Sequence, residues 1–213
     1  MGIPQIKSYP MPVKESLPEN KVSWPLESHR SILLIQDMQQ YFLNPFTPKA
    51  SPVVELIHNI AKLKQEAVKR NIPIVYTAQP GAQQPEDRRL LTDFWGPGLD
   101  DSKDLIKIID ELSPAAEDTV LTKWRYSAFK RSNLLHLMQE QGRDQIIICG
   151  VYAHIGCLMT ASEAFMLDQQ AFLVADAVAD FSEEEHMMAL KYAAGRCARA
   201  LTTEDVFFDW GQQ

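Results

Sequence analysis

Three polar positions stand at or just after the ends of stretches that the sequence predicts to be buried strands. Asp37 follows the apolar run at 31–36, Lys123 follows the run at 119–122, and a glycine-containing turn at 152–156 follows a third run. Because the carboxyl ends of parallel strands meet at one edge of a sheet, these groups are expected to converge there and form a ligand pocket. Taken singly, Asp37 is explained equally well as a turn cap and Lys123 as a solvated surface charge.

The stretch CGVYAHIGC at 149–157 is the centre of this arrangement. Gly150 and Gly156 allow close backbone approach where a buried strand turns into a helix, which is where open parallel sheets hold their ligands. Cys149, Cys157 and Cys197 are odd in number and lack paired spacing or companion histidines, so neither a disulfide framework nor a zinc site is indicated. Reduced, buried thiols are the favoured interpretation.

The elements that must position these residues alternate between strand and helix. Strands are predicted at 31–36, 72–77, 119–122, 146–151, 171–175 (ending in Asp176) and 198–203, and helices at 52–70, 103–112, 132–141, 155–165 and from Ser182 to about Cys197. A long polar loop is expected at 81–98. The predicted fold class is α/β: a doubly wound parallel sheet of about six strands with helices on both faces, in a Rossmann-like three-layer arrangement.

Length and composition favour one domain at 31–213, preceded by an extended arm at 1–30 that carries five prolines. The arm is expected to lie across the body or a partner subunit. The net charge of −7 argues against a nucleic-acid surface. No apolar run approaches the roughly 18 residues of a membrane helix, and the start lacks a basic segment followed by an apolar one. A soluble, cytoplasmic protein without a membrane partner is expected.

Five motifs together resemble the isochorismatase branch of the isochorismatase-like hydrolase superfamily. They are LLIQDMQQYF (33–42), VYTAQPGAQQPEDRRLLTDFWGPG (75–98), LTKWRYSAF (121–129), CGVYAHIGC (149–157) and VADAVADFS (174–182), and the opening GIPQIKSYPMP also matches. The resemblance implies the same six-stranded fold and an ether hydrolase. The enzyme would cleave the enol-ether bond of isochorismate to pyruvate and 2,3-dihydroxy-2,3-dihydrobenzoate for catechol siderophore synthesis, without metal or organic cofactor. A sister group acts on 2-amino-2-deoxyisochorismate on the way to phenazines.

The resemblance also assigns roles to residues around a small anionic substrate. Asp37 is the candidate general acid that protonates the vinyl group, with Lys123 beside it as a catalytic partner. The substrate-binding set is Gln79, Arg88, Tyr152, Gly156, Phe42 and Trp95. Arg88 suits a carboxylate because its planar fork can donate to both oxygens, and Arg89 is its rival. Because the acid must carry a proton, activity on bound substrate is expected to decline as the pH rises.

Two positions depart from related patterns. Superfamily thiol hydrolases such as nicotinamidases place a cysteine where this chain has Gly156, and Cys157, one residue later on a helix, lies about 100° around the axis. Cys157 is therefore interpreted as a packing residue. Gln36 replaces the histidine that commonly precedes the aspartate, and strand alternation predicts that it points to the opposite face. His154 is interpreted as a structural histidine rather than a base.

Several alternatives stay open at this point. A thiol amidohydrolase is disfavoured by Gly156, and a non-catalytic interaction module by the presence of both Asp37 and Lys123. The arm and the resemblance suggest a homodimer. Siderophore synthetases or carrier proteins are further expected partners, since many members continue into an aryl carrier domain; a stand-alone hydrolase and an excised domain both fit this chain. No residue here distinguishes isochorismate from its 2-amino analogue.

Overall fold

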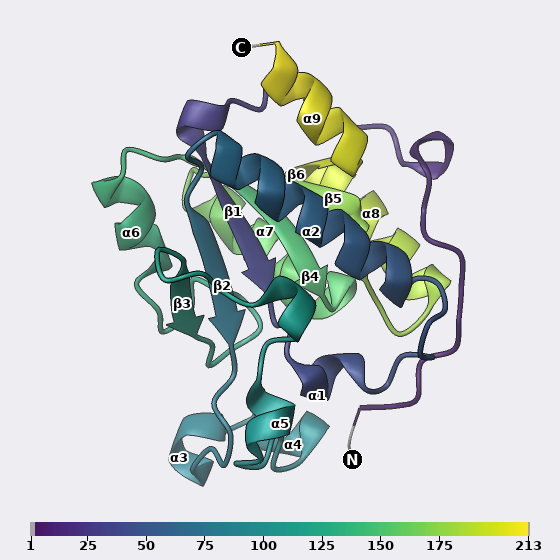
Figure 1. Ribbon diagram of the computed structural model, residues 1–213, viewed down its shortest axis with the longest axis vertical. Coiled ribbons are helices and arrows are strands. Elements are labelled where there is room, and N and C mark those ends of the chain that lie inside the picture. Colours follow the sequence, from purple (N-terminus) through teal and green to yellow (C-terminus); the bar gives the residue numbers. More distant parts are fainter. Residues whose placement is uncertain (1–2, 213) are drawn as a thin grey trace.

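The computed structural model describes residues 3–212, so the first two residues of the predicted arm and Gln213 of the predicted domain lie outside it. Its centre is a six-stranded sheet with every neighbouring pair parallel (Figure 1). The strands are β1 (Ser31–Gln36), β2 (Ile74–Ala78), β3 (Thr119–Thr122), β4 (Gln145–Val151), β5 (Gln170–Ala179) and β6 (Ala198–Leu201). Their order, β3-β2-β1-β4-β5-β6, confirms the predicted doubly wound parallel sheet.

Helices cover both faces of the sheet. The α-helices are α1 (Gln40–Leu43), α2 (Val53–Lys69), α3 (Pro85–Arg88), α4 (Leu91–Trp95), α5 (Lys103–Ile106), α6 (Leu134–Glu140), α7 (Leu158–Met166), α8 (Glu183–Arg196) and α9 (Thr203–Gly211). Side chains of α2 and α9 share one apolar cluster with one face of the sheet, and those of α6, α7 and α8 share a second cluster with the other. The result is a three-layer sandwich.

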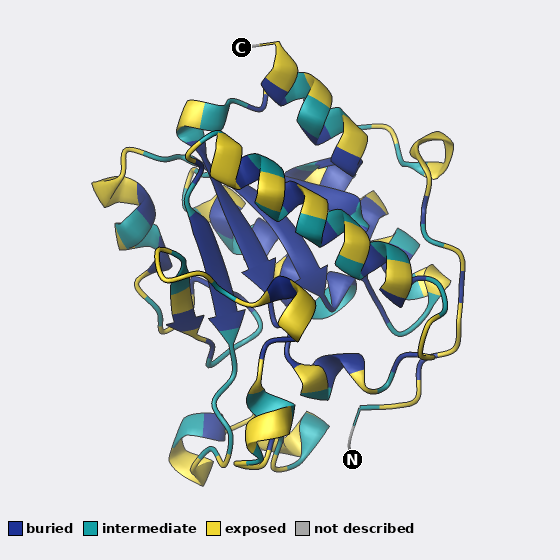
Figure 2. Ribbon diagram, viewed as in Figure 1, coloured by how far each residue is buried: buried dark blue, intermediate teal, exposed yellow. Residues whose placement is uncertain are grey.

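The central strand shows why the sequence folds this way. In β1, Leu33 and Ile35 pack toward α2, and Ile32 and Leu34 pack toward the opposite helices, all four fully buried. A strand that is covered on both faces is expected to be largely apolar, as this one is from Ile32 to Ile35. Figure 2 shows that the central strands are buried, whereas the edge strand β3 is partly exposed and the helices expose their outer surfaces.

Three predicted elements need correction, and one helix was not predicted. The segment 81–98 is not a plain loop, because it contains α3 and α4. The helix predicted at 103–112 is broken into α5 and the 3-10 turn η3 (Asp110–Leu112). Strand β5 continues past Asp176 to Ala179, since the residues after Asp176 are again small and apolar. Finally, α9 was not predicted; it is capped by Thr202, whose side chain accepts from the Asp205 amide.

The arm before residue 31 lies along the body of its own chain and contains two 3-10 turns, η1 (Lys14–Ser16) and η2 (Ser28–Arg30). Ile6 forms a parallel bridge with Phe46, and Tyr9 is buried against the end of β5. None of the helices within residues 3–212 has the length and hydropathy that crossing a bilayer requires.

Candidate active site

The floor of the site is an ion pair between Asp37 and Lys123, both about 4% exposed. Asp37 directly follows β1 with a φ of 55° and accepts a hydrogen bond of 2.7 Å from the Thr77 hydroxyl at its other oxygen. Pairing of β1 with β2 and of β2 with β3 brings the ends of the three strands level. The register therefore produces the convergence that was predicted from strand ends alone.

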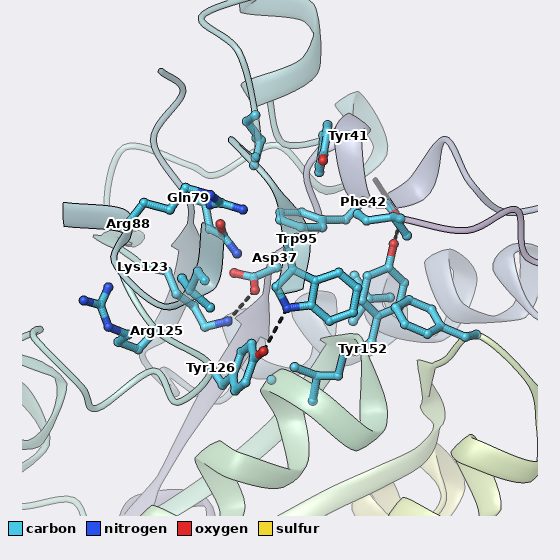
Figure 3. Close-up of a pocket in the computed structure, with 18 residues that line it drawn as sticks. Asp37, Tyr41, Phe42, Gln79, Arg88, Trp95, Lys123, Arg125, Tyr126 and Tyr152 are labelled. Atoms are coloured by element: carbon cyan, nitrogen blue, oxygen red, sulfur yellow. Dashed lines mark hydrogen bonds and ion pairs between the residues drawn. The ribbon is translucent and has the colours of Figure 1, made fainter. Parts of the chain in front are cut away.

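A pocket opens above this pair, with about 600 Å³ of empty space, part of it open to solvent. All eight residues predicted for the site line it: Asp37, Phe42, Gln79, Arg88, Trp95, Lys123, Tyr152 and Gly156 (Figure 3). They come from β1, α1, the β2 end, α3, α4, the β3 end and the turn after β4.

Sequence reasoning missed ten other lining residues: Ile3, Tyr41, Leu91, Gly98, Leu99, Arg125, Tyr126, Val151, Ile155 and Phe181. Some carried a signal. Tyr41 adjoins Phe42, Leu91 stands four residues before Trp95, and Arg125 and Tyr126 follow Lys123 within one motif. Phe181 was missed because the end of β5 was placed too early. Ile3, at the far end of the arm, had no local signal.

Arg88 presents a buried guanidinium to the pocket. Its Nε donates to the Gly96 carbonyl at 2.5 Å, and its Nη1 has no partner within residues 3–212. The group packs flat against Gly98, where a Cβ would lie 2.4 Å from the guanidinium carbon. Burial lowers the pKa of Arg88, an effect that nearby Tyr41 and Tyr126 only partly oppose. A buried cation left with a free donor is ready for an anionic ligand.

Arg89, the rival position, is directed elsewhere. It is exposed, and its Nε donates to the Glu86 carbonyl on the outside of α3. Arg89 does not line the pocket, whereas the Arg88 side chain points toward its centre in Figure 3. The structure thus places Arg88, and not the adjacent Arg89, in the pocket, a choice for which the sequence alone gave little support.

Gln79 is held in place by a second amide. The buried Gln39 side chain accepts from the Gln79 amide at 2.7 Å and donates to the Gln79 carbonyl at 2.9 Å, and it also donates to Ile106. These bonds use the backbone of Gln79 and leave its side chain to point into the pocket (Figure 3). Gln79 can therefore offer both a donor and an acceptor to a ligand.

Aromatic side chains form the apolar wall. The Tyr152 ring lies 4.5 Å from that of Phe181, and the Tyr152 hydroxyl donates to the Phe42 carbonyl at 2.6 Å. Trp95 donates from its indole nitrogen to the Tyr126 hydroxyl at 2.8 Å. Since these polar groups are engaged within the protein, the wall offers mainly ring faces to a ligand.

In the turn after β4, the position at which related thiol hydrolases have their nucleophilic cysteine is Gly156, which has no side chain. Gly156 lines the pocket in the π-helical turn η4 (Ala153–Cys157), and a Cβ on it would lie 3.2 Å from the Lys123 nitrogen. Cys157 is fully buried in the apolar cluster beneath, where burial raises its thiol pKa well above the ordinary value. Its enclosure in this cluster agrees with the interpretation of Cys157 as a packing residue.

Gln36 behaves partly as predicted. It leaves β1 on the α7 side, the face opposite to Ile35, and its carbonyl oxygen lies 2.9 Å from the Thr160 hydroxyl. Its Nε2, however, ends 2.1 Å from the point that a Cβ on Gly156 would occupy. The predicted face is therefore confirmed, but strand alternation did not predict that the amide would end next to Gly156.

His154 is structural, as predicted. Its Nδ1 and its backbone amide both lie 2.6 Å from the oxygens of the buried Asp180. Within residues 3–212, ligand atoms of His154, Asp180 and Glu185 lie within 4.8 Å of one another, a spacing that could hold a metal ion. Asp180 already accepts hydrogen bonds from His154 and from the Phe181 amide, so its oxygens are engaged within the protein.

Sequence comparisons agree with this geometry. The family model for the isochorismatase domain matches residues 31–205. An isochorismatase of Bacillus subtilis is 61% identical over 97% of this chain, and enterobactin synthase component B of Escherichia coli K12 is 52% identical over 97%. The chain spans 66% and 72% of the lengths of those two proteins. A phenazine biosynthesis protein of Pseudomonas aeruginosa is 50% identical over 96% of this chain and 98% of its own length.

Solved structures share the fold. A cysteine hydrolase of Pseudomonas syringae superposes with a TM-score of 0.80, covering 88% of this chain and 95% of that one, at 21% identity. An isochorismatase family protein of Desulfovibrio vulgaris gives a TM-score of 0.72 at 23% identity, covering 84% of this chain and 98% of that one. At such identities the similarity establishes the architecture alone.

Proposed function

The chain belongs to the isochorismatase family of hydrolases, and from that premise we propose that it hydrolyses the enol-ether bond of isochorismate. The products are pyruvate and 2,3-dihydroxy-2,3-dihydrobenzoate. The observation that carries this proposal is the bare Gly156 beside the buried Asp37–Lys123 pair. Among residues 3–212, the pocket is lined by an acid and a cation but by no sulfur atom, which suits an ether cleaved by proton transfer better than an amide cleaved by a thiol.

The pocket matches the charges of the substrate. Isochorismate has two carboxylates, and the free donor of Arg88 supplies a partner for one of them. Lys123 supplies a positive charge for the other, on the enol side, next to Asp37. Gln79 contacts a ring hydroxyl, and the faces of Tyr152, Phe42 and Trp95 hold the ring.

The reaction itself needs a proton and a water molecule. Asp37 donates its proton to the terminal methylene carbon of the vinyl ether, and the electron pair of the double bond forms the new C–H bond. The resulting oxocarbenium ion is trapped by water, which loses a proton to give a hemiketal. The hemiketal collapses to pyruvate and the ring alcohol, and a proton returns to Asp37.

Binding and protonation are coupled through Lys123. In the free protein both Asp37 oxygens are engaged, one by Thr77 and the other by Lys123. A substrate carboxylate that attracts Lys123 weakens the ion pair between Lys123 and Asp37. The negative charge of that carboxylate also favours the protonated form of Asp37. The rate on bound substrate should therefore decline with rising pH, and a flat kcat profile between about pH 5 and 9 would argue against Asp37 as the acid.

The direct test is pyruvate release from isochorismate, followed with a coupled reductase, using the native chain and Asp37→Ala. We expect release that is lost in the variant. Cys157→Ala is the matched control, because it removes the nearest thiol without touching the pocket; unchanged release would exclude a thiol mechanism. Absence of release from the native chain would contradict the proposal and favour the interaction-module hypothesis.

A second candidate substrate is 2-amino-2-deoxyisochorismate. It is favoured by the 50% identity to the phenazine biosynthesis protein over nearly the full length of both chains. The two substrates differ by one hydroxyl or amino substituent, so both fit the same pocket. The ratio of their kcat/KM values in the same assay decides between them.

The cellular setting follows from the preferred substrate. We place the enzyme in the cytoplasm, in catechol siderophore synthesis, with synthetase or carrier-protein partners like those implied by the name of the enterobactin relative. A homodimer is the proposed assembly. Light scattering that gives about 24 kDa at micromolar concentration would contradict the dimer.

A further inference from the structure

The Gln36 side chain occupies the room beneath Gly156. The position of a Cβ on Gly156 lies 2.1 Å from Gln36 Nε2 and 3.2 Å from Lys123 Nζ. The amide and the ammonium group therefore both lie next to the point where a side chain of residue 156 would begin. Gln36 itself is fully buried at the end of β1, and it is absent from the pocket lining.

Hydrogen bonding fixes which way this amide faces. The Thr160 hydroxyl lies 2.9 Å from Gln36 Oε1 and 2.8 Å from the Gly156 carbonyl oxygen, and it accepts from the Ala128 amide. A hydroxyl has one proton and cannot donate to both oxygens. In this orientation Gln36 Nε2 also lacks a partner within residues 3–212. Both conflicts disappear when the amide is turned over, with Nε2 donating to Thr160 and the carbonyl facing Gly156 and Lys123.

We propose that Gln36 is a positioning residue that takes the place of the absent nucleophile, packing its amide carbonyl against Gly156 and steadying Lys123 from below. Gly156 is then required because a side chain there would collide with Gln36. Gln36 and Gly156 together exclude a thiol from the position where a superfamily cysteine hydrolase would place it. The kinetic part of this inference rests on the proposed function, whereas the steric part does not.

The steric part is tested by a thermal double-mutant cycle with Gly156→Ala, Gln36→Ala and the double variant. We expect Gly156→Ala to lower Tm by at least 5 °C in the native background and by less than 2 °C in the Gln36→Ala background. Folding of the double variant but not of Gly156→Ala alone gives the same support. Equal losses in both backgrounds, or failure of both Gly156→Ala proteins to fold, would overturn the proposal.

A thiol introduced by Gly156→Cys provides an independent test that uses no substrate. With Gln36 truncated to Ala, the sulfur has room beside Lys123, whose charge promotes the reactive thiolate. The native cysteines are buried, so background alkylation is low. We expect iodoacetamide at pH 7 to label position 156, located by peptide mass mapping, at least tenfold faster in the double variant than in folded Gly156→Cys. Equal rates would overturn the proposal.

The positioning role is tested with Gln36→Met, which keeps the length of the side chain but removes the carbonyl. We expect kcat on isochorismate to fall at least tenfold and KM to change less than threefold, because Gln36 does not line the pocket. The pH dependence of kcat should also shift, since Lys123 is less firmly placed. A Tm loss with unchanged kcat and pH profile would show a merely structural residue and overturn this role. If the native chain has no hydrolase activity, the thermal and labelling tests still decide the steric part.

Discussion

Two buried aspartates stand at the carboxyl edge of the same sheet, and each faces a basic side chain. Asp37 follows β1 and pairs with Lys123, and Asp180 follows β5 and pairs with His154. Both carboxylates are buried. Burial and a nearby cation therefore do not separate them, although only Asp37 lines the pocket.

The nature of their donors separates them. Asp180 accepts from two backbone amides, those of His154 and Phe181, in addition to the His154 ring. Asp37 accepts from two side chains, Thr77 and Lys123. Backbone donors are fixed by the fold, whereas side chains can turn toward an arriving ligand. The comparison indicates that a carboxylate held by exchangeable side chains beside a pocket is suited to chemistry, and one held by backbone amides is suited to structure.

Asp180 also connects the arm to the pocket wall. Its backbone amide donates to the Tyr9 hydroxyl at 2.7 Å, and the next residue, Phe181, packs on Tyr152. The arm residue Ile3 reaches the pocket lining. The structural aspartate thus helps to place the wall against which the catalytic aspartate would work.

The largest expected effect is on catalysis by Asp37→Asn. The amide keeps the shape of the carboxyl group but cannot supply the proton, so kcat should fall by about 10²–10⁴-fold, the usual contribution of a general acid. Steady-state pyruvate release measures this, with far-UV circular dichroism confirming that the variant is folded. A decline of less than about fivefold in kcat would contradict the proposed difference between the two aspartates, because Asp37 would then contribute no more to catalysis than Asp180.

Asp180→Asn should produce the opposite pattern. Its amide would present N–H groups to backbone donors and leave His154 without its counter-charge, which should cost about 3 kcal/mol of unfolding free energy. For a chain of this size that corresponds to a Tm lower by roughly 6–12 °C. Calorimetry and kinetics on the folded variant should show this loss with kcat reduced less than tenfold. Unchanged Tm with lost activity would reverse the two assignments.

Arg88→Gln tests the proposed contact between the Arg88 guanidinium and a substrate carboxylate. Loss of a charged hydrogen bond to the substrate should lower kcat/KM by roughly 10–100-fold, mainly through KM. Because one buried donor of the guanidinium has no partner among residues 3–212, its removal should leave Tm unchanged or raise it. Arg89→Gln, at the residue that directly follows α3, is the matched control and should change kcat/KM less than threefold. Similar losses in both variants would contradict the assignment of the carboxylate to Arg88.

Much of this arrangement could be predicted from sequence because it depends on local pattern and on the level ends of parallel strands. The apolar run before Asp37 identified β1, and the register of a parallel sheet then required Asp37 and Lys123 to meet. The same argument included the turn at 152–156, and the remaining predicted residues were carried over from the family resemblance. The structure brings them into one pocket, and their roles stay predictions.

What could not be predicted depends on long-range contact. Nothing near Ile3 indicates that the arm folds back to the pocket, and the bond between Tyr9 and Asp180 joins residues 171 positions apart. The place of Gln36 under Gly156 likewise follows from the packing of α7 on β1. Strand alternation predicted the face on which Gln36 leaves the sheet but not the point that its amide reaches.

The smallest expected effect concerns the His154–Asp180 pair and its dependence on pH. Burial lowers the pKa of His154, but the hydrogen bond to Asp180 and its charge, helped by Glu185, outweigh burial and raise the pKa above its ordinary value. A group whose pKa is raised on folding contributes stability that is complete below its unfolded value, near 6.5, and is lost as the pH rises through the folded value. The Tm difference between the native chain and His154→Gln should therefore be largest near pH 6 and shrink toward pH 9. His136→Gln, on the exposed face of α6, is the control and should show little difference at either pH. A Tm difference between the native chain and His154→Gln that stays constant across this range would mean that the ring stabilises the fold only through packing. The charge of His154 would then not contribute to holding Asp180, contrary to the proposed contrast between the two aspartates.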